Sequence, residues 1–78
     1  SATIYHDCSI AEHVHIAPNA TLCGNVTIEN GAHIGASSTV IEGKTIPSFC
    51  IVGAGAVVAQ NWQNASKLIG IPAKPYPS

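Results

Sequence analysis

Charged residues are scarce in this chain. Asp, Glu, Lys and Arg make up 9% of its 78 residues, against roughly 25% in ordinary soluble domains. We expect a surface this poor in charge to be partly covered by a partner, and therefore predict a homo-oligomer. The three basic residues are too few to form a basic patch, which argues against a nucleic-acid-binding or membrane-binding protein.

Long apolar runs are also missing. No stretch approaches the ~20 residues needed to span a bilayer, and no signal peptide is recognisable. Cysteine is sparse and odd in number, with three residues, which favours reduced thiols packed as small apolar groups. These features predict a single small cytosolic domain.

A branched aliphatic residue recurs at every sixth position. The series runs without a slip through Ile4, Ile10, Ile16, Leu22, Ile28, Ile34, Val40, Ile46, Val52 and Val58. A hexapeptide period is typical of a parallel β-helix. In an α-helix, six residues turn through about 240°, so the aliphatic residues would spread around the helix instead of lining one face.

The same period predicts the architecture. Three hexapeptides would close one triangular coil, and successive coils would stack at ~4.8 Å. We therefore predict an all-β solenoid of about three coils in residues 1–60. For residues 61–78 we predict a turn at 61–64, a last strand at 66–69 and a terminal bend at 70–74, with Pro75 and Pro77 stopping further pairing.

Residues that precede the aliphatic positions should stack in columns with a spacing of eighteen. Two of the columns are rich in Thr, as expected of an exposed strand surface. The third column has His15 and His33 in place of Thr, followed by Ile51. This face differs chemically from the others, and we expect it to carry function, either by binding a ligand or by packing at an interface.

Another candidate is His6, at a predicted corner beside Asp7. A neighbouring carboxylate can hold a histidine in one tautomer and keep it basic, as a general base requires. The alternative is a solvated turn residue. A metal site is a weaker hypothesis, because His13 and His15 would place their rings on one side of a strand without a third ligand at a matching spacing.

Two glycine-rich segments, 35–38 and 53–56, should line up one coil apart. The absence of large side chains there would bare backbone groups in a groove that suits a long, thin ligand. Tight packing at a corner explains the same composition equally well.

Taken together, these patterns resemble the hexapeptide-repeat acyltransferases. The closest resemblance is to sugar acetyltransferases of the sialic-acid O-acetyltransferase and bacillosamine-type N-acetyltransferase family. Besides the hexapeptide series, it rests on four segments, His6–Ile10, His15–Val26, Val52–Val58 and Gly70–Lys74.

The resemblance implies a left-handed coil and a homotrimer with its active sites between subunits. It implies acetyl-CoA as the acyl donor, a sugar or nucleotide sugar as the acceptor, and no metal. The residues that match the family's functional positions are His6 as the general base with Asp7 to orient it, His15 as a contact to acetyl-CoA, Ala36 and Ala54 as backbone lining of its groove, and Lys74 near the CoA phosphates.

The chain departs from the family pattern in two respects. Tyr5 stands where family members commonly have an acidic residue, so Asp7 would orient His6 alone. The family's N-terminal nucleotide-sugar-binding domain is missing, and we expect Ser1 to mark a cut through a longer protein. Two other hypotheses remain: a zinc solenoid of the γ-carbonic-anhydrase kind, and a purely structural or ice-binding solenoid.

Overall fold

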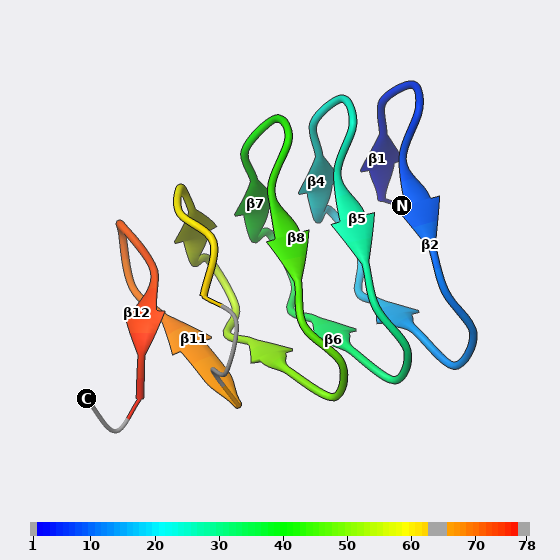
Figure 1. Ribbon diagram of the computed structural model, residues 1–78. Coiled ribbons are helices and arrows are strands. Elements are labelled where there is room, and N and C mark those ends of the chain that lie inside the picture. Colours follow the sequence, from blue (N-terminus) through cyan, green and yellow to red (C-terminus); the bar gives the residue numbers. More distant parts are fainter. Residues whose placement is uncertain (1, 63–65, 77–78) are drawn as a thin grey trace.

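The computed structural model describes residues 2–62 and 66–76, and within them the chain winds into a triangular solenoid (Figure 1). The solenoid measures 31 × 20 × 19 Å. No helix that could span a membrane occurs in these two stretches. The three sides of the solenoid are β-sheets, with one two-residue strand per side in each regular coil, and the strands of successive coils pair in parallel.

Each side of the solenoid is one sheet, named here A, B or C. Sheet A contains β1 (Thr3–Ile4), β4 (Thr21–Leu22), β7 (Thr39–Val40) and β10 (Val57–Val58). Sheet B contains β2 (Ser9–Ile10), β5 (Thr27–Ile28) and β8 (Thr45–Ile46). Sheet C contains β3 (His15–Ile16), β6 (His33–Ile34), β9 (Ile51–Val52), β11 (Lys67–Ile69) and β12 (Lys74–Pro75).

The register has the predicted spacing of eighteen. Thr3 pairs with Thr21 and His15 with His33, and the same offset continues through the later coils. The predicted parallel β-helix is therefore confirmed. The number of coils was underestimated: the structure has about four, because β10 and β11 form two sides of a further coil after the three regular ones.

The sharp corners follow from one backbone conformation. At every corner from residue 7 to residue 55, the third residue after the aliphatic position has a positive φ, between 58° and 76°. These residues are Asp7, His13, Asn19, Asn25, Gly31, Ser37, Gly43, Phe49 and Gly55. Gly, Asn and Asp adopt this left-handed conformation at low cost. Ser37 and Phe49 are held there by bonds to the preceding coil, from Ser37 N–H to the Pro18 carbonyl oxygen at 3.2 Å and from Phe49 N–H to the Asn30 carbonyl oxygen at 3.0 Å.

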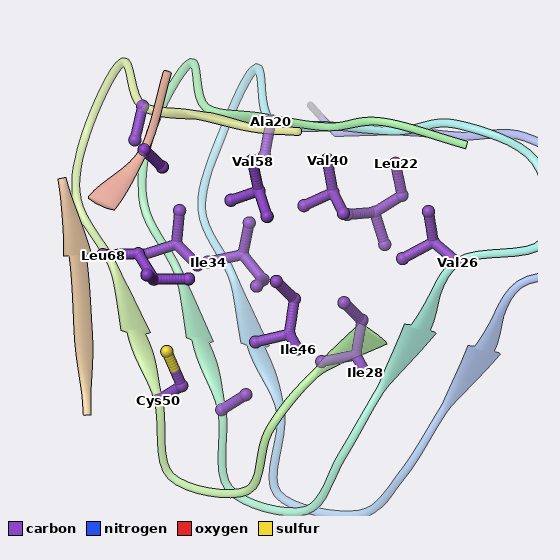
Figure 2. Close-up of a cluster of buried hydrophobic side chains, with 14 residues drawn as sticks. Ala20, Leu22, Val26, Ile28, Ile34, Val40, Ile46, Cys50, Val58 and Leu68 are labelled. Carbon is purple, nitrogen blue, oxygen red and sulfur yellow. The ribbon is translucent and has the colours of Figure 1, made fainter. Parts of the chain in front are cut away.

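The core is a column of aliphatic side chains inside the solenoid (Figure 2). From Leu22 to Val58 the aliphatic residues of the hexads are 0–1% exposed. The small residues four positions after them, such as Ala20, Ala32 and Ala56, are also buried. In the first coil Ile4 and Ile10 remain 46% and 41% exposed, because no described coil covers that end.

The last coil is irregular after β10. The side-chain oxygen of Asn61 accepts the Thr45 backbone N–H at 2.8 Å, where a backbone carbonyl serves in earlier coils. Trp62 packs against the core. Part of the turn predicted at 61–64, namely Gln63 and Asn64, lies outside the described residues. The strand predicted at 66–69 corresponds to β11, which pairs with β9 in parallel.

Pro75 does not stop pairing, contrary to the prediction. It lies in β12, which pairs with β11 in antiparallel orientation and forms the edge of sheet C. An edge strand tolerates proline because the missing N–H can face away from the sheet.

Candidate functional site

His6 lies at the corner between sheets A and B, which we call the histidine corner. Its Nδ1 lies 3.0 Å from Oδ2 of Asp7, and the two side chains are 79% and 73% exposed. With Nδ1–H donating to the carboxylate, Nε2 carries the lone pair and faces away from Asp7. An ion pair this exposed contributes little to stability. The chemical consequence of the contact is therefore the choice of tautomer.

Gly24 lies beneath His6 in the next coil. A Cβ atom at Gly24 would be 3.5 Å from Cε1 and 3.7 Å from Nε2 of His6, so the imidazole lies over this glycine at contact distance. The backbone N–H of Asn25 donates to the His6 carbonyl oxygen at 3.2 Å, which fixes the two corners relative to each other. Our sequence reasoning missed this role of Gly24, although its spacing of eighteen from His6 pointed to it.

His15 and His33 form a stacked pair on the outer face of sheet C. Their ring centroids are 4.6 Å apart, and their planes are inclined by 20°. Both side chains are exposed, and Ile51 continues the column. The predicted histidine column is therefore confirmed.

Ala36 and Ala54 lie one coil apart at the corner between sheets C and A, which we call the alanine corner. Both are exposed, and the N–H of Gly55 donates to the Ala36 carbonyl oxygen at 2.9 Å. Buried Gly35 brings the coils close together at this corner: a Cβ there would lie 2.5 Å from the Val52 carbonyl oxygen. The alignment predicted for the glycine-rich segments is confirmed.

Lys74 is exposed on β12, next to the last turn of the solenoid. The adjacent Ala73 is buried, and its N–H donates to the Val57 carbonyl oxygen at 2.7 Å, which ties this segment to sheet A. Lys67 on β11 lies with its Nζ 5.8 Å from the centroid of the Tyr76 ring. Two of the chain's three cations therefore lie at the C-terminal end of sheet C.

One chain does not bring all the predicted site residues together. His15 lies on sheet C, and Ala36 and Ala54 lie at the edge that sheet C shares with sheet A. His6 is at the opposite edge of sheet A, across one side of the triangle. Within one chain, the two groups are therefore separated by the width of sheet A.

The structure does not support the strand position assigned to His13. This residue has a φ of 61° and lies in the corner before β3, so it does not share a strand face with His15. In residues 2–62 and 66–76 there is no group of three or more His, Cys, Asp or Glu residues that could hold a metal ion. The stacked rings of His15 and His33 also face each other instead of converging on one point.

Comparison with known proteins identifies the repeat. Residues 7–42 match the bacterial transferase hexapeptide family, described as six repeats. The chain is 38% identical to the acetyltransferase domain of PglB from Neisseria gonorrhoeae FA1090, solved in complex with acetyl coenzyme A, with a TM-score of 0.91. In sequence and fold the chain is therefore similar to hexapeptide-repeat transferases. The match covers 95% of this chain and 36% of the PglB chain.

A second similar solved structure is a histidine-to-alanine mutant of GDP-perosamine N-acetyltransferase from Caulobacter crescentus, in complex with CoA and GDP-perosamine. It is 26% identical, with a TM-score of 0.74, and the match covers 95% of this chain and 52% of that one. Serine acetyltransferase from N. gonorrhoeae, at 23% identity and a TM-score of 0.58, shares the fold. No curated protein sequence matches the chain significantly.

Proposed function

We propose that this chain is the acyl-transfer part of an acetyl-CoA-dependent sugar acetyltransferase. The acceptor would be an amino or hydroxyl group of a sugar or nucleotide sugar. The observation that carries the proposal is the His6–Asp7 pair, with Nε2 of His6 free at an exposed corner of a solenoid that closely resembles the acetyl-CoA-bound PglB domain. The likeness to a transferase bound to CoA and GDP-perosamine supports the sugar acceptor.

In the proposed mechanism, His6 acts as the general base. Nε2 takes a proton from the acceptor as its nitrogen or oxygen attacks the thioester carbonyl of acetyl-CoA. The C–S bond then breaks, and the CoA thiolate leaves with a proton from the imidazolium, so that His6 returns to its neutral form. Asp7 fixes the tautomer that leaves Nε2 free to accept this proton. A base of this kind contributes typically 10²–10⁴-fold.

The donor would lie along the outer face of sheet C and the alanine corner. His15 and the backbone of Ala36 and Ala54 fit the acetyl and pantetheine part, and Lys74 offers a cation for the CoA phosphates. A backbone N–H at this corner would stabilise the oxyanion, a contribution of about 3 kcal/mol.

The proposed assembly is a homotrimer. The separation of His6 from the alanine corner across sheet A supports it, because the sheet C face of one subunit would complete the histidine corner of its neighbour. The low charge of the chain, at 9%, and its exposed Ile51, at 45%, agree with a covered face. Its free cysteines suit the reducing bacterial cytoplasm, where we place it.

The replacement His6→Ala tests the proposal. Turnover of acetyl-CoA with the sugar acceptor should fall by about 10²–10⁴-fold, while the mass measured by light scattering stays the same. His13→Ala is the matched control, because His13 is an exposed corner histidine without a role in the mechanism, and it should keep full activity. Full activity in His6→Ala would refute the assignment of the base. Zinc in the purified protein would favour the carbonic-anhydrase-like hypothesis.

A further inference from the structure

We propose that His33 is a positioning residue that holds the ring of His15 in place. The inference rests on the proposed function for its consequence, because His15 is the expected contact to acetyl-CoA. The contact itself is a structural fact: the ring centroids are 4.6 Å apart, and the planes are inclined by 20°.

The backbone register produces this stack. β3 and β6 are adjacent parallel strands, and His15 pairs directly with His33. The spacing of neighbouring strands is about 4.8 Å, close to the distance at which aromatic rings stack. Two histidines at the same position of successive coils therefore meet face to face without any distortion of the backbone.

His15 depends on this one neighbour. In the order of sheet C, β3 is the edge strand and β6 is its partner. Within the described residues no strand lies on the other side of β3, and the His15 side chain is exposed. An exposed imidazole would otherwise rotate freely about its side-chain torsions. The ring of His33 removes much of that freedom before a ligand arrives, which lowers the entropic cost of binding.

The column also shows that histidine at position 33 is a departure from the surrounding pattern. In the second and third coils, the corresponding positions of sheets A and B hold Thr21, Thr27, Thr39 and Thr45. A threonine would satisfy the strand at position 33 equally well, but it would not offer a flat ring to His15. The choice of histidine is therefore explained by the neighbouring ring and not by the fold.

Two replacements separate stacking from every other role of His33. His33→Thr restores the residue type of the other columns and removes the ring, whereas His33→Phe keeps a flat ring without nitrogen atoms. In wild-type protein, NMR should show mutual ring-current shifts of the imidazole C–H protons of His15 and His33. The shift at His15 should disappear in His33→Thr and persist in His33→Phe. This readout does not depend on catalysis.

The kinetic readout tests whether the position of the ring matters. In His33→Thr, KM for acetyl-CoA should rise by about 3- to 10-fold, the range expected for one lost aromatic pair, while kcat changes little because His6 lies at another corner. His33→Phe should restore KM. An equal rise of KM for acetyl-CoA in both variants would mean that a nitrogen of His33 acts directly. An unchanged KM in both variants would mean that the stack does not position His15. Either result overturns the inference.

Failure of the proposed function would look different. If acetyl-CoA neither binds nor reacts with wild-type protein, the acyltransferase assignment falls, and the ring-current shifts still decide whether His33 holds His15. If acetyl-CoA reacts normally but the His15 shift is the same in wild-type protein and His33→Thr, the inference falls and the acyltransferase assignment stands.

Discussion

Replacing Gly35 by Ala should disturb the packing of the alanine corner more than a methyl group added at any other position. A Cβ at Gly35 would lie 2.5 Å from the Val52 carbonyl oxygen and 2.8 Å from the Ala54 nitrogen. Both contacts are with backbone atoms of the next coil, which cannot rotate away as a side chain can. Contacts of a Cβ atom under 3.0 Å are essentially never seen, so the next coil has to move by about 0.5 Å or more.

The expected change in the free energy of unfolding follows from two opposing effects. Overpacking of a well-packed site costs typically about 1–3 kcal/mol. The loss of backbone freedom in the unfolded chain returns about 0.4–1 kcal/mol. We expect Gly35→Ala to lower the free energy of unfolding by a net of about 1–2 kcal/mol. Because Ala54 belongs to the displaced segment, acetyl-CoA should also bind more weakly.

Gly24→Ala is the matched control. Its nearest contact would be with the His6 ring at 3.5 Å, an ordinary van der Waals distance, so stability should be unchanged or raised by about 0.4–1 kcal/mol. Denaturant unfolding followed by Trp62 fluorescence, at a fixed protein concentration, gives the stabilities, and calorimetric titration gives the affinity for acetyl-CoA. The reasoning is refuted if Gly35→Ala matches Gly24→Ala in both measurements.

Two further predictions concern the core. Burial raises the pKa of the Cys50 thiol above its ordinary value of 9.0, so above about pH 9 the unfolded chain loses a proton that the folded chain keeps. The free energy of unfolding should then fall by up to about 1.4 kcal/mol per pH unit. The fall should be steeper than in Cys50→Ala, a variant that has the residue found at the same position of the preceding coil, Ala32. Equal slopes in alkaline unfolding titrations would contradict this. Ile28→Ala should cost about 2–5 kcal/mol and Ile10→Ala less than half as much, because these side chains are 1% and 41% exposed; equal costs in denaturant unfolding would contradict the coil-end explanation.

The sequence was sufficient to predict the solenoid because its period acts at two levels. Six residues set the length of one side, and eighteen residues set which side chains stack, so the partners of His15 or Thr3 follow from counting. The count of coils failed because the last coil is built differently. Asn61 substitutes a side-chain oxygen for a backbone carbonyl, and Trp62 packs where a small residue would otherwise be expected.

Corner conformations were only partly predictable. The residue types of Asn19 and Gly31 indicate a left-handed backbone conformation, whereas those of His13 and Phe49 do not. At Phe49 the conformation is set by its surroundings: its ring lies against Gly31, where a Cβ would be 2.4 Å from the ring, and its N–H bonds to the preceding coil. Tertiary contacts of this kind leave no trace in local propensity.

The candidate site was predictable where its residues are neighbours in sequence or one coil apart. The contact between His6 and Asp7 follows from adjacency, and the stack of His15 on His33 follows from the period. The separation of His6 from Ala54 across sheet A could not be predicted in this way, because it depends on which corner each hexapeptide occupies in the triangle.

The strict register of the sheets limits how this chain can change in length. Gaining or losing one residue within a hexapeptide would turn every later aliphatic side chain out of the core. A gain or loss of six would keep burial intact but rotate all later residues onto the next side of the triangle, so that His33 would no longer meet His15. An insertion or deletion of eighteen residues after His33, a whole lap, would instead keep every later residue on its own side and leave the contact between His15 and His33 in place.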